Sequence, residues 1–308
     1  MPAPARKRRE TLAVNGLLLL NKPGGMTSNR ALQTVKRLFK AKKAGHTGSL
    51  DPAATGMLPL CFGEATKVCA YLLDADKTYR VVAKLGEATD TGDADGTVTA
   101  TGDIPALDSA SWQAIFSEFL GEISQVPPMY SALKKDGKRL YELARQGIEV
   151  ERPARKVHIH ALELIEYRGS RLAFRVACSK GTYVRTLVED LAKRAGTLAH
   201  TVSLHREAVA GFESAPMLDL AALETMEEAA LRDSLLPIDR ALQHLDACGL
   251  AAGQDAFFMQ GQPVAAPDSA AAAGQLLRAY SSNGQFLGIA EATGDGRLAP
   301  KRVFHLTP

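Results

Sequence analysis

The chain has 308 residues, of which 46% are hydrophobic and 23% are charged. These proportions are ordinary for a globular protein and exclude a mainly disordered or fibrous chain. The formal net charge of +3 says little about partners, because it averages basic and acidic stretches that can lie on different faces of the molecule.

The N-terminal segment is interpreted as a flexible basic leader, residues 1–15. Its cations at 6–9 and the apolar run at 12–20 imitate a secretory signal, but Asn15 and Gly16 interrupt the run and no small-residue cleavage site follows. No stretch approaches the roughly 18 apolar residues of a membrane span. The four cysteines form no C-x-x-C pair, which favours reduced thiols. We expect a cytoplasmic protein that does not enter a membrane.

A strand and a basic helix are predicted next. Residues 16–20 form a short apolar run that suits a buried strand, and Lys22–Gly25 is a turn signal. Thr27 or Ser28 can cap a helix with apolar residues at helical spacing. The apolar positions are Leu32, Val35, Leu38 and Phe39, and the cations of the opposite face are Lys36, Arg37, Lys40 and Lys43. A solvated face explains such a pattern in an isolated helix, but charge of a single sign favours contact with phosphates.

The middle of the chain mixes strands and helices without a regular βαβ order. The pattern predicts strands at 57–62 and 79–85, helices at 66–73, 109–120 and 186–195, and a hairpin that joins 157–167 to 171–178. We therefore expect the α+β class, with a mixed, largely antiparallel sheet flanked by helices.

A second, smaller unit is expected after residue 246. Residues 218–245 have a helical pattern, and the composition then changes to an Ala-rich loop at 265–274. Short strands are predicted at 275–281, 286–292 and 303–306. A unit of about 60 residues is small but can fold against a larger neighbour. The predicted organisation is a catalytic domain at 16–246 and a small β-rich domain at 247–308.

Motifs for several common enzyme chemistries are absent from the sequence. It contains no G-x-x-x-x-G-K-[ST], G-x-G-x-x-G, G-x-S-x-G or H-E-x-x-H, so nucleotide hydrolysis, dinucleotide binding and serine-hydrolase chemistry lose support. Thr91–Gly96 is partly similar to a calcium loop but lacks the Glu of the twelfth position, and a turn between strands fits better. Neither the pair His158 and His160 nor the pair His200 and His205 has a carboxylate or Cys at ligand spacing. We assign no metal and no cofactor.

The least ordinary stretch is the glycine-rich segment Gly45–Gly56, which contains His46 and Asp51. Its three glycines describe a constrained loop whose backbone comes close to another group. Pro52 biases Asp51 toward an extended backbone, which would hold the carboxylate on a rigid loop. Judged by spacing alone, an aspartate that caps a turn remains the favoured interpretation.

The same segment resembles a known family. Gly45–Pro52 is similar to the catalytic-aspartate motif of TruB-type pseudouridine synthases, and the similarity extends through Lys67. Further matching segments follow the expected order: Asn21–Ser28, Asp76–Tyr79, Pro127–Lys134 and Cys178–Arg185. The resemblance covers Gly16–Arg206 and, more weakly, the tail. One departure is His205, because the family usually has two basic residues after the position of Leu204.

The resemblance implies an isomerase that detaches uracil from its ribose and reattaches it through carbon, at uridine 55 in the T loop of tRNA. The implied catalytic residues are Asp51 as nucleophile, Arg185 beside it, and Tyr79. A neighbouring cation lowers the pKa of a carboxyl group, so Arg185 is expected to keep Asp51 ionised. Tyr79 is expected to stack on the flipped uracil, and its hydroxyl or a water to carry the C5 proton. This chemistry needs no metal and no cofactor.

The resemblance also implies the substrate contacts and the partners. The implied substrate-binding residues are His46, Tyr79, Tyr183, Leu204, Lys22 and Lys180, with His46 filling the space that the flipped base leaves. The tail is implied to be an RNA-binding domain of the PUA kind. The compact length and the lack of a long Lys-rich tail argue against the guide-RNA-dependent relatives. We expect a monomer that acts on the T stem-loop of tRNA without an obligate protein partner.

Two other functions stay open on the sequence. A non-catalytic protein could bind structured RNA through the basic helix and the C-terminal unit, with the glycine-rich loop as a backbone clamp. A hydrolase could use Asp51 in phosphoryl or acyl transfer, and would then depend on a divalent metal or form a covalent phosphate.

Overall fold

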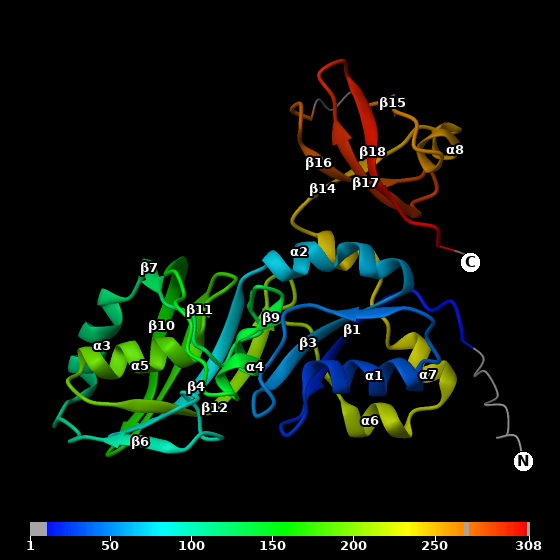
Figure 1. The fold of residues 1–308 in the computed structure, drawn as a ribbon. Helices are drawn as coiled ribbons and strands as arrows, with labels where there is room; N and C mark the ends of the chain where they lie inside the picture. The colour runs from blue at the N-terminus through cyan, green and yellow to red at the C-terminus, as the bar shows by residue number, and fades with distance from the viewer. Residues whose placement is uncertain (1–10, 268–270, 307–308) are drawn as a thin grey trace, which may run out of the picture.

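The computed structural model describes residues 11–267 and 271–306, which form one large sheet, one smaller sheet, two short hairpins and the helices around them (Figure 1). Most of the predicted basic leader at 1–15 lies outside the described residues. No helix of the described part is both long and apolar enough to cross a membrane.

The larger sheet has nine strands in the order β13-β1-β3-β12-β4-β11-β10-β7, with β2 paired to β3. The strands are β1 Gly16–Lys22, β2 Ala44–His46, β3 Thr55–Phe62, β4 Lys77–Leu85, β7 Gly121–Gln125, β10 Arg155–Arg168, β11 Arg171–Cys178, β12 Ala199–Val209 and β13 Leu218–Asp219. The pairs β1–β13 and β3–β12 are parallel, and the other pairs of this sheet are antiparallel. This confirms the predicted mixed, largely antiparallel sheet.

Helices cover the two halves of this sheet differently. They are α1 Ser28–Leu38, η1 Gly63–Val68, α2 Cys69–Asp74, α3 Ser109–Glu118, α4 Leu140–Ala144, α5 Val184–Arg194, α6 Leu220–Thr225, α7 Glu228–Asp233 and η2 Ile238–Leu242. Helix α1 packs on β1 and β3 beside α6 and α7, and α3 and α5 pack on β4, β10 and β11 (Figure 1). As predicted, Thr27 caps α1, and Leu32 and Val35 are buried. The helices at 109–120 and 186–195 and the hairpin of β10 and β11 are also confirmed.

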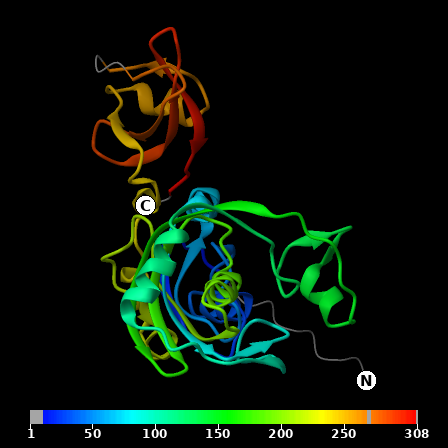
Figure 2. The same cartoon turned by 90° about the vertical axis from the view of Figure 1, so that its left-hand side faces the viewer.

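Two short hairpins extend from the sheet. Strands β5 Glu87–Thr89 and β6 Val98–Thr101 pair with each other, as do β8 Lys134–Lys135 and β9 Lys138–Arg139. The segment with β8, β9 and α4 projects to one side of the molecule, as Figure 2 shows.

Strand β12, which lies between β3 and β4, has no counterpart among the predicted elements. Its pairing with β4 shifts register between Thr201 and Ser203 and again between Arg206 and Ala208. Each irregularity breaks the alternation of side chains that marks a strand in sequence. Because of these bulges, the sequence pattern does not predict β12, although it is a central strand of the sheet.

The prediction of a helical segment at 218–245 is only partly right. Leu218 pairs with Leu20 as the short strand β13, Met226 has an extended backbone that ends α6, and Pro237 precedes η2. Since proline cannot donate a backbone hydrogen bond, a continuous helix through this position is disfavoured. The segment folds as short helices around one edge of the sheet.

The smaller sheet is built from the C-terminal residues. Its order is β14-β16-β17-β18-β15, with β14 Asp246–Gly249, β15 Val264–Ala265, β16 Leu276–Tyr280, β17 Phe286–Ala292 and β18 Arg297–Val303, and α8 Gln254–Met259 packs beside it. This confirms the predicted β-rich unit, although the strand expected at 303–306 is instead β18, which ends at Val303. Phe286, Ile289 and Phe304 pack against Leu17 and other apolar residues beside the large sheet, so the two units share a contact.

Candidate active site

Asp51 lies on the loop between β2 and β3, and hydrogen bonds fix this loop on both sides. Leu50 donates its backbone N–H to the Ser28 hydroxyl (2.8 Å), and that hydroxyl donates to the Leu50 carbonyl (3.1 Å). The Gly25 N–H donates to the Pro52 carbonyl at 2.9 Å. These bonds tie the neighbours of Asp51 to the turn between β1 and α1, so the carboxylate projects from a rigid backbone.

Arg185, in the first turn of α5, holds the carboxylate of Asp51. Its Nε lies 2.9 Å from Asp51 Oδ2. The remaining guanidinium nitrogens donate to the carbonyls of Thr91 (2.5 Å) and Tyr130 (2.7 Å), and Nη1 is 3.5 Å from Asp93 Oδ2. The Arg185 side chain is 6% exposed, whereas that of Asp51 is 42% exposed. The cation is therefore immobile, and the carboxylate it holds stays open to an incoming molecule.

The pKa of Asp51 is raised from its ordinary value. Burial is the largest cause, the charge of Arg185 opposes it, and the charge of Asp93 adds to the increase. Arg185 lowers the Asp51 pKa as expected, but burial has the larger effect, so the net change is upward. The physical reason is that desolvation outweighs a cation whose charge is shared with a second carboxylate.

A cavity of about 30 Å³ lies against Asp51. Asp93, Arg185, Thr201 and Leu204 line it. Since a water molecule needs about 10 to 15 Å³ of such space, this cavity holds a water but not a pyrimidine ring. A nucleotide can reach Asp51 only from its exposed side or after the walls of the cavity separate.

Tyr79 and Leu204 come from the neighbouring strands β4 and β12. Both are part-buried and pack against the core formed by α3, α5, β4, β10 and β11. Burial raises the pKa of Tyr79, and the charge of Arg206, which faces Tyr79 in the strand register, partly opposes this increase. The hydroxyl is therefore protonated at neutral pH and can act as a base only if it passes its own proton on.

His46 and Tyr183 lie at the ends of elements that border the same region. His46 ends β2, and its buried Nδ1 has no hydrogen-bond partner within residues 11–267 and 271–306. Burial lowers the pKa of His46, which leaves the ring neutral at neutral pH. Tyr183 precedes α5, where its N–H donates to the Gln125 side chain at 3.1 Å. The backbone of each residue is therefore held in a regular element or by a hydrogen bond beside the site.

The structure does not support substrate contact by Lys22. Its side chain is buried with 0% exposure, and its ammonium group donates to the carbonyls of Pro23 (2.8 Å), Met26 (2.8 Å) and Pro52 (3.2 Å). With its donors used, Lys22 stabilises the loop of Asp51 and has no proton left for RNA.

Lys180 is not brought to Asp51 either. It is an exposed residue after β11, with an ion pair of 2.8 Å to Asp74. Such an exposed pair contributes little to stability, so Lys180 can exchange Asp74 for a phosphate. Lys180 is exposed enough to contact RNA, but it does not line the cavity at Asp51.

Three residues beside Asp51 were missed from the sequence, namely Ser28, Asp93 and Arg206. The turn at Thr91–Gly96 was predicted correctly, but it also folds back on β12, where the Ala94 N–H donates to the Thr201 carbonyl at 2.9 Å. This hydrogen bond places the carboxylate of Asp93 close to the guanidinium of Arg185. The acidic composition of the turn was a signal, but its partner is far away in sequence and could not be inferred.

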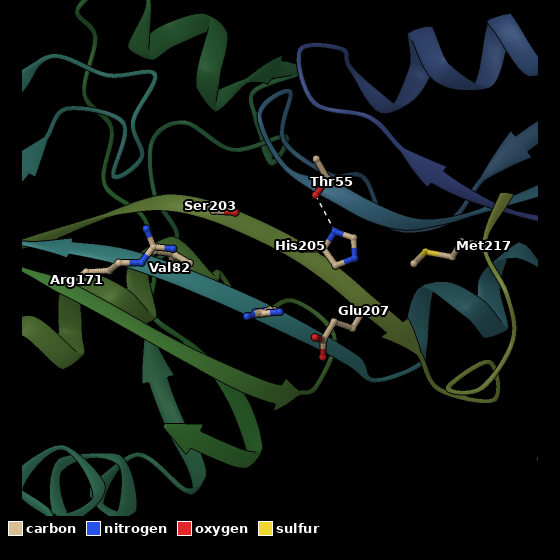
Figure 3. A pocket seen from close by; sticks show the side chains of 8 residues that line it. Thr55, Val82, Arg171, Ser203, His205, Glu207 and Met217 are labelled. Atoms are coloured by element: carbon tan, nitrogen blue, oxygen red, sulfur yellow. Dashed lines mark hydrogen bonds between the residues drawn. The ribbon is translucent and has the colours of Figure 1, made fainter. Parts of the chain in front are cut away.

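Another groove lies on the opposite face of the sheet. It has a volume of about 610 Å³, and Arg80, Arg171, Glu207 and Met217 are among the residues that line it (Figure 3). There His205 Nδ1 forms a hydrogen bond of 2.8 Å with the Thr55 hydroxyl (Figure 3). Because side chains alternate along a strand, His205 points away from the face reached by Leu204 and Arg206. The departure at His205 therefore does not touch the pocket of Asp51.

Metal ligation has no visible basis in the described part of the chain, where no group of three or more His, Cys, Asp or Glu is arranged to hold an ion. What the site does provide is one accessible carboxylate on a rigid loop, one buried cation bound to it, and part-buried aromatic residues beside it. These groups suit chemistry at a carbon centre next to a planar base.

Models of one protein family match the chain in three successive segments. Residues 36–184 match the TruB family pseudouridylate synthase (N terminal domain), residues 185–243 the tRNA pseudouridylate synthase B C-terminal domain, and residues 248–304 the C-terminal domain of pseudouridine synthase II TruB.

Relatives named tRNA pseudouridine synthase B are similar to nearly the whole chain. The protein of Aromatoleum aromaticum is 50% identical over 303 residues, which cover 98% of this chain and 97% of its own length. That of Chromohalobacter salexigens is 48% identical over 301 residues, with 98% and 97% covered. Among solved structures, a chain of a Cbf5-Nop10-Gar1 complex has a TM-score of 0.72 and 25% identity, over 94% of this chain and 85% of its own. A chain of an H/ACA RNP bound to a substrate RNA containing 2'-deoxyuridine has a TM-score of 0.71 at 23% identity, over 94% and 85%, which shows the shared fold.

Proposed function

The chain belongs to the TruB family of pseudouridine synthases, and we propose that it converts uridine 55 in the T loop of tRNA to pseudouridine with Asp51 as the catalytic carboxylate. The family makes it an isomerase, and relatives of about half-identical sequence are named for pseudouridine synthesis in tRNA. The observation that carries the proposal is the carboxylate of Asp51, held on a rigid loop at 2.9 Å from Arg185 and still 42% exposed.

The reaction conserves all atoms of the nucleotide. The bond between C1′ and N1 of uracil breaks, a bond between C1′ and C5 forms, the proton of C5 leaves and N1 gains a proton. Asp51 can serve by attacking the sugar, by attacking the base or by promoting elimination at the sugar, and in each case its ionised form is the reactive one. Arg185 fixes the direction of the carboxylate through a hydrogen bond to one of its oxygens.

Access to uridine in folded RNA requires the base to leave its stack, at a cost of a few kcal/mol. Stacking on an aromatic side chain recovers about 1 to 3 kcal/mol per base, and Tyr79 is the aromatic residue we assign to this contact. Leu204 lines the cavity beside Asp51, and we assign Tyr183, which precedes α5, to the same pocket. His46 is suited to fill the space that the base leaves in the RNA, because its ring is neutral and it ends the strand that leads into the loop of Asp51. The protonated Tyr79 hydroxyl favours a relay through water for the C5 proton.

The RNA is proposed to lie along the basic surfaces around this site. Helix α1 presents Lys36 and Arg37, whereas Lys40 is paired with Glu228 at 2.9 Å. The projecting segment adds exposed cations, which are Lys134, Lys135, Lys138, Arg139 and Arg145. We propose that residues 16–246 form the catalytic domain and that 247–308 act as a PUA-like RNA-binding domain for the T stem-loop, in a cytoplasmic monomer without an obligate protein partner.

The test is to map pseudouridine in a tRNA transcript incubated with purified protein, with Asp51→Asn as the matched variant. We expect modification at position 55 by the wild type, none by Asp51→Asn, and similar tRNA affinity for both. If the wild type binds tRNA but modifies no position, the alternative of a non-catalytic RNA-binding protein is supported. Loss of activity in excess chelator would favour the alternative of a metal-dependent hydrolase. Pseudouridine formation by Asp51→Asn would show that the reaction does not need the Asp51 carboxylate.

A further inference from the structure

Arg206 on β12 is a buried cation without a carboxylate partner among the described residues. Its side chain is 1% exposed. Nε donates to the carbonyl of Met57 at 2.6 Å and Nη2 to the carbonyl of Gly48 at 2.8 Å. Burial of an unpaired charge costs several kcal/mol unless hydrogen bonds compensate it. A residue kept under such conditions calls for a reason beyond general stability.

The two carbonyls bound by Arg206 stand on either side of Asp51. Gly48 precedes Asp51 in the loop, and Met57 follows it at the start of β3. A Cβ atom on Gly48, whose φ is +67°, would lie 3.3 Å from Arg206 Nη1, and one on Gly56, whose φ is +99°, would lie 2.2 Å from the Arg206 carbonyl oxygen. The close approach of the Arg206 backbone therefore requires glycine at position 56 in β3, and the Arg206 side chain packs tightly against Gly48 in the catalytic loop.

The same guanidinium reaches Tyr79. Arg206 and Tyr79 face each other in the register of β12 and β4. Burial raises the pKa of Tyr79, and the charge of Arg206 opposes this increase, as expected for a cation close to the ring. One side chain therefore contacts the loop of Asp51 and the aromatic residue assigned to the base.

The backbone alone attaches this loop weakly to β12. The parallel pairing of β3 with β12 consists of Thr55 with His205 and Gly56 with Arg206. On the far face, the hydrogen bond between Thr55 and His205 supports this short junction (Figure 3). On the catalytic face, the guanidinium of Arg206 extends the attachment into the loop itself.

We propose that Arg206 is a positioning residue, which holds the loop of Asp51 and the ring of Tyr79 in a fixed relation so that both meet the same nucleotide. The inference rests on the proposed pseudouridine synthesis, because it concerns the geometry of that reaction. A planar guanidinium can bind several acceptors in different directions at once, whereas an ammonium group on a flexible stem holds them less rigidly. Lysine at this position would keep the charge and lose the geometry.

The experiment compares Arg206→Lys with the wild type and with a matched control, Arg175→Lys. Arg175 is an exposed arginine of β11 that pairs with Glu207 and Glu163 and lies away from the site. We expect the single-turnover rate of Arg206→Lys to fall about 10²-fold, since a misplacement of about 1 Å costs that much. Its tRNA dissociation constant is expected to stay within about threefold of the wild type, because a positioning residue does not bind an RNA phosphate. Loss of a phosphate contact would instead change both the tRNA affinity and its salt slope. Arg175→Lys is expected to keep the wild-type rate.

A second variant separates positioning from folding. Arg206→Ala is measured with and without added guanidinium ion, at a temperature well below the melting midpoint of each protein. Recovery of rate with guanidinium, without a change in tRNA affinity, supports a local positioning role. A wild-type rate in Arg206→Lys, a loss confined to tRNA affinity, or a rate loss that guanidinium does not reverse would overturn it. If the wild type itself forms no pseudouridine, the proposed function fails and the Arg206 variants are not the cause.

Discussion

Replacing Arg185 with Met should move the acid limb of activity to higher pH, and replacing Asp93 with Asn should move it to lower pH. Arg185 lowers the pKa of Asp51 through its charge and its hydrogen bond, and Asp93 raises that pKa. If the ionised carboxylate is the reactive form, activity falls as pH drops through the Asp51 pKa. Without Arg185 this decline begins at a higher pH, and without the charge of Asp93 at a lower one.

The stability effect of Arg185→Met can be worked from its contacts. Two hydrogen bonds from a charged group to the carbonyls of Thr91 and Tyr130 are lost, and each is worth about 1.5 kcal/mol. The ion pair with Asp51 adds little, because that carboxylate is 42% exposed. The sum of about 3 kcal/mol corresponds to a melting midpoint roughly 6 to 12 °C lower. We expect kcat/KM to fall about 10²-fold as well, because the carboxylate loses its fixed direction.

The assay is kcat/KM for tRNA modification from pH 5 to 9, with melting curves at each pH. Arg185→Lys is the matched control, since it keeps the charge and loses the fork of donors. It should show a lower rate with an acid limb close to that of the wild type. If the limbs of Arg185→Met and Asp93→Asn coincide, or move in the same direction, Asp51 is not the group that titrates and the electrostatic reasoning is refuted.

Three further predictions concern stability and binding. The pKa of Asp51 is raised in the folded protein, so its ionisation destabilises the fold progressively as pH rises through that pKa. The melting midpoint of Asp51→Asn should therefore be higher than that of the wild type at neutral pH and equal to it at acid pH. A lower melting midpoint at neutral pH would contradict this. Replacing Lys36 and Arg37 with Ala should reduce the salt slope of tRNA binding by about 2, one for each lost phosphate contact. An unchanged slope would show that these side chains are solvated and do not contact the RNA. Gly56→Ala places a Cβ atom 2.2 Å from the Arg206 carbonyl oxygen. Gly169→Ala is the control for backbone strain alone, about 1 to 3 kcal/mol, because its φ is also positive but its added Cβ meets no atom within 4 Å. We expect Gly56→Ala to lose more free energy of unfolding in denaturant than this control, and an equal loss would contradict the close approach of Arg206.

The class of the fold could be predicted because most of its elements have regular patterns. The helix at 28–38, the strand that carries Tyr79, and strand β11 each show a regular period of apolar residues. Strand β12 could not be predicted, because its bulges break the period although it lies between β3 and β4. Tertiary contacts, not local preference, make that segment a strand.

The site was predictable only as far as its motifs reach. Glycine spacing around Asp51 indicated a constrained loop, and the family resemblance supplied its role. Asp93 and Arg206 enter through contacts between residues far apart in sequence, such as Arg206 with Gly48, and a single sequence carries no signal for such pairs. The burial of Lys22, which was expected to contact the substrate, could not be inferred either, because its ammonium group also donates to the carbonyl of Pro52 in the catalytic loop.

The cations beneath the catalytic loop explain how its carboxylate stays reactive. Burial lowers the pKa of Lys22 and of Lys77 to about 8, so at neutral pH both remain charged at a cost to stability that is relieved only as pH rises through that value. Their ammonium groups, like the guanidinium of Arg206, bind backbone carbonyls. A direct ion pair with Asp51 would be more stable, but it would occupy the oxygen that the reaction needs. Lys22 and Arg206 fix the loop through its backbone carbonyls, whereas Lys77 binds carbonyls of α2. The carboxylate therefore keeps Arg185 as its one ion-pair partner within the described residues, and its other oxygen is free to meet the nucleotide.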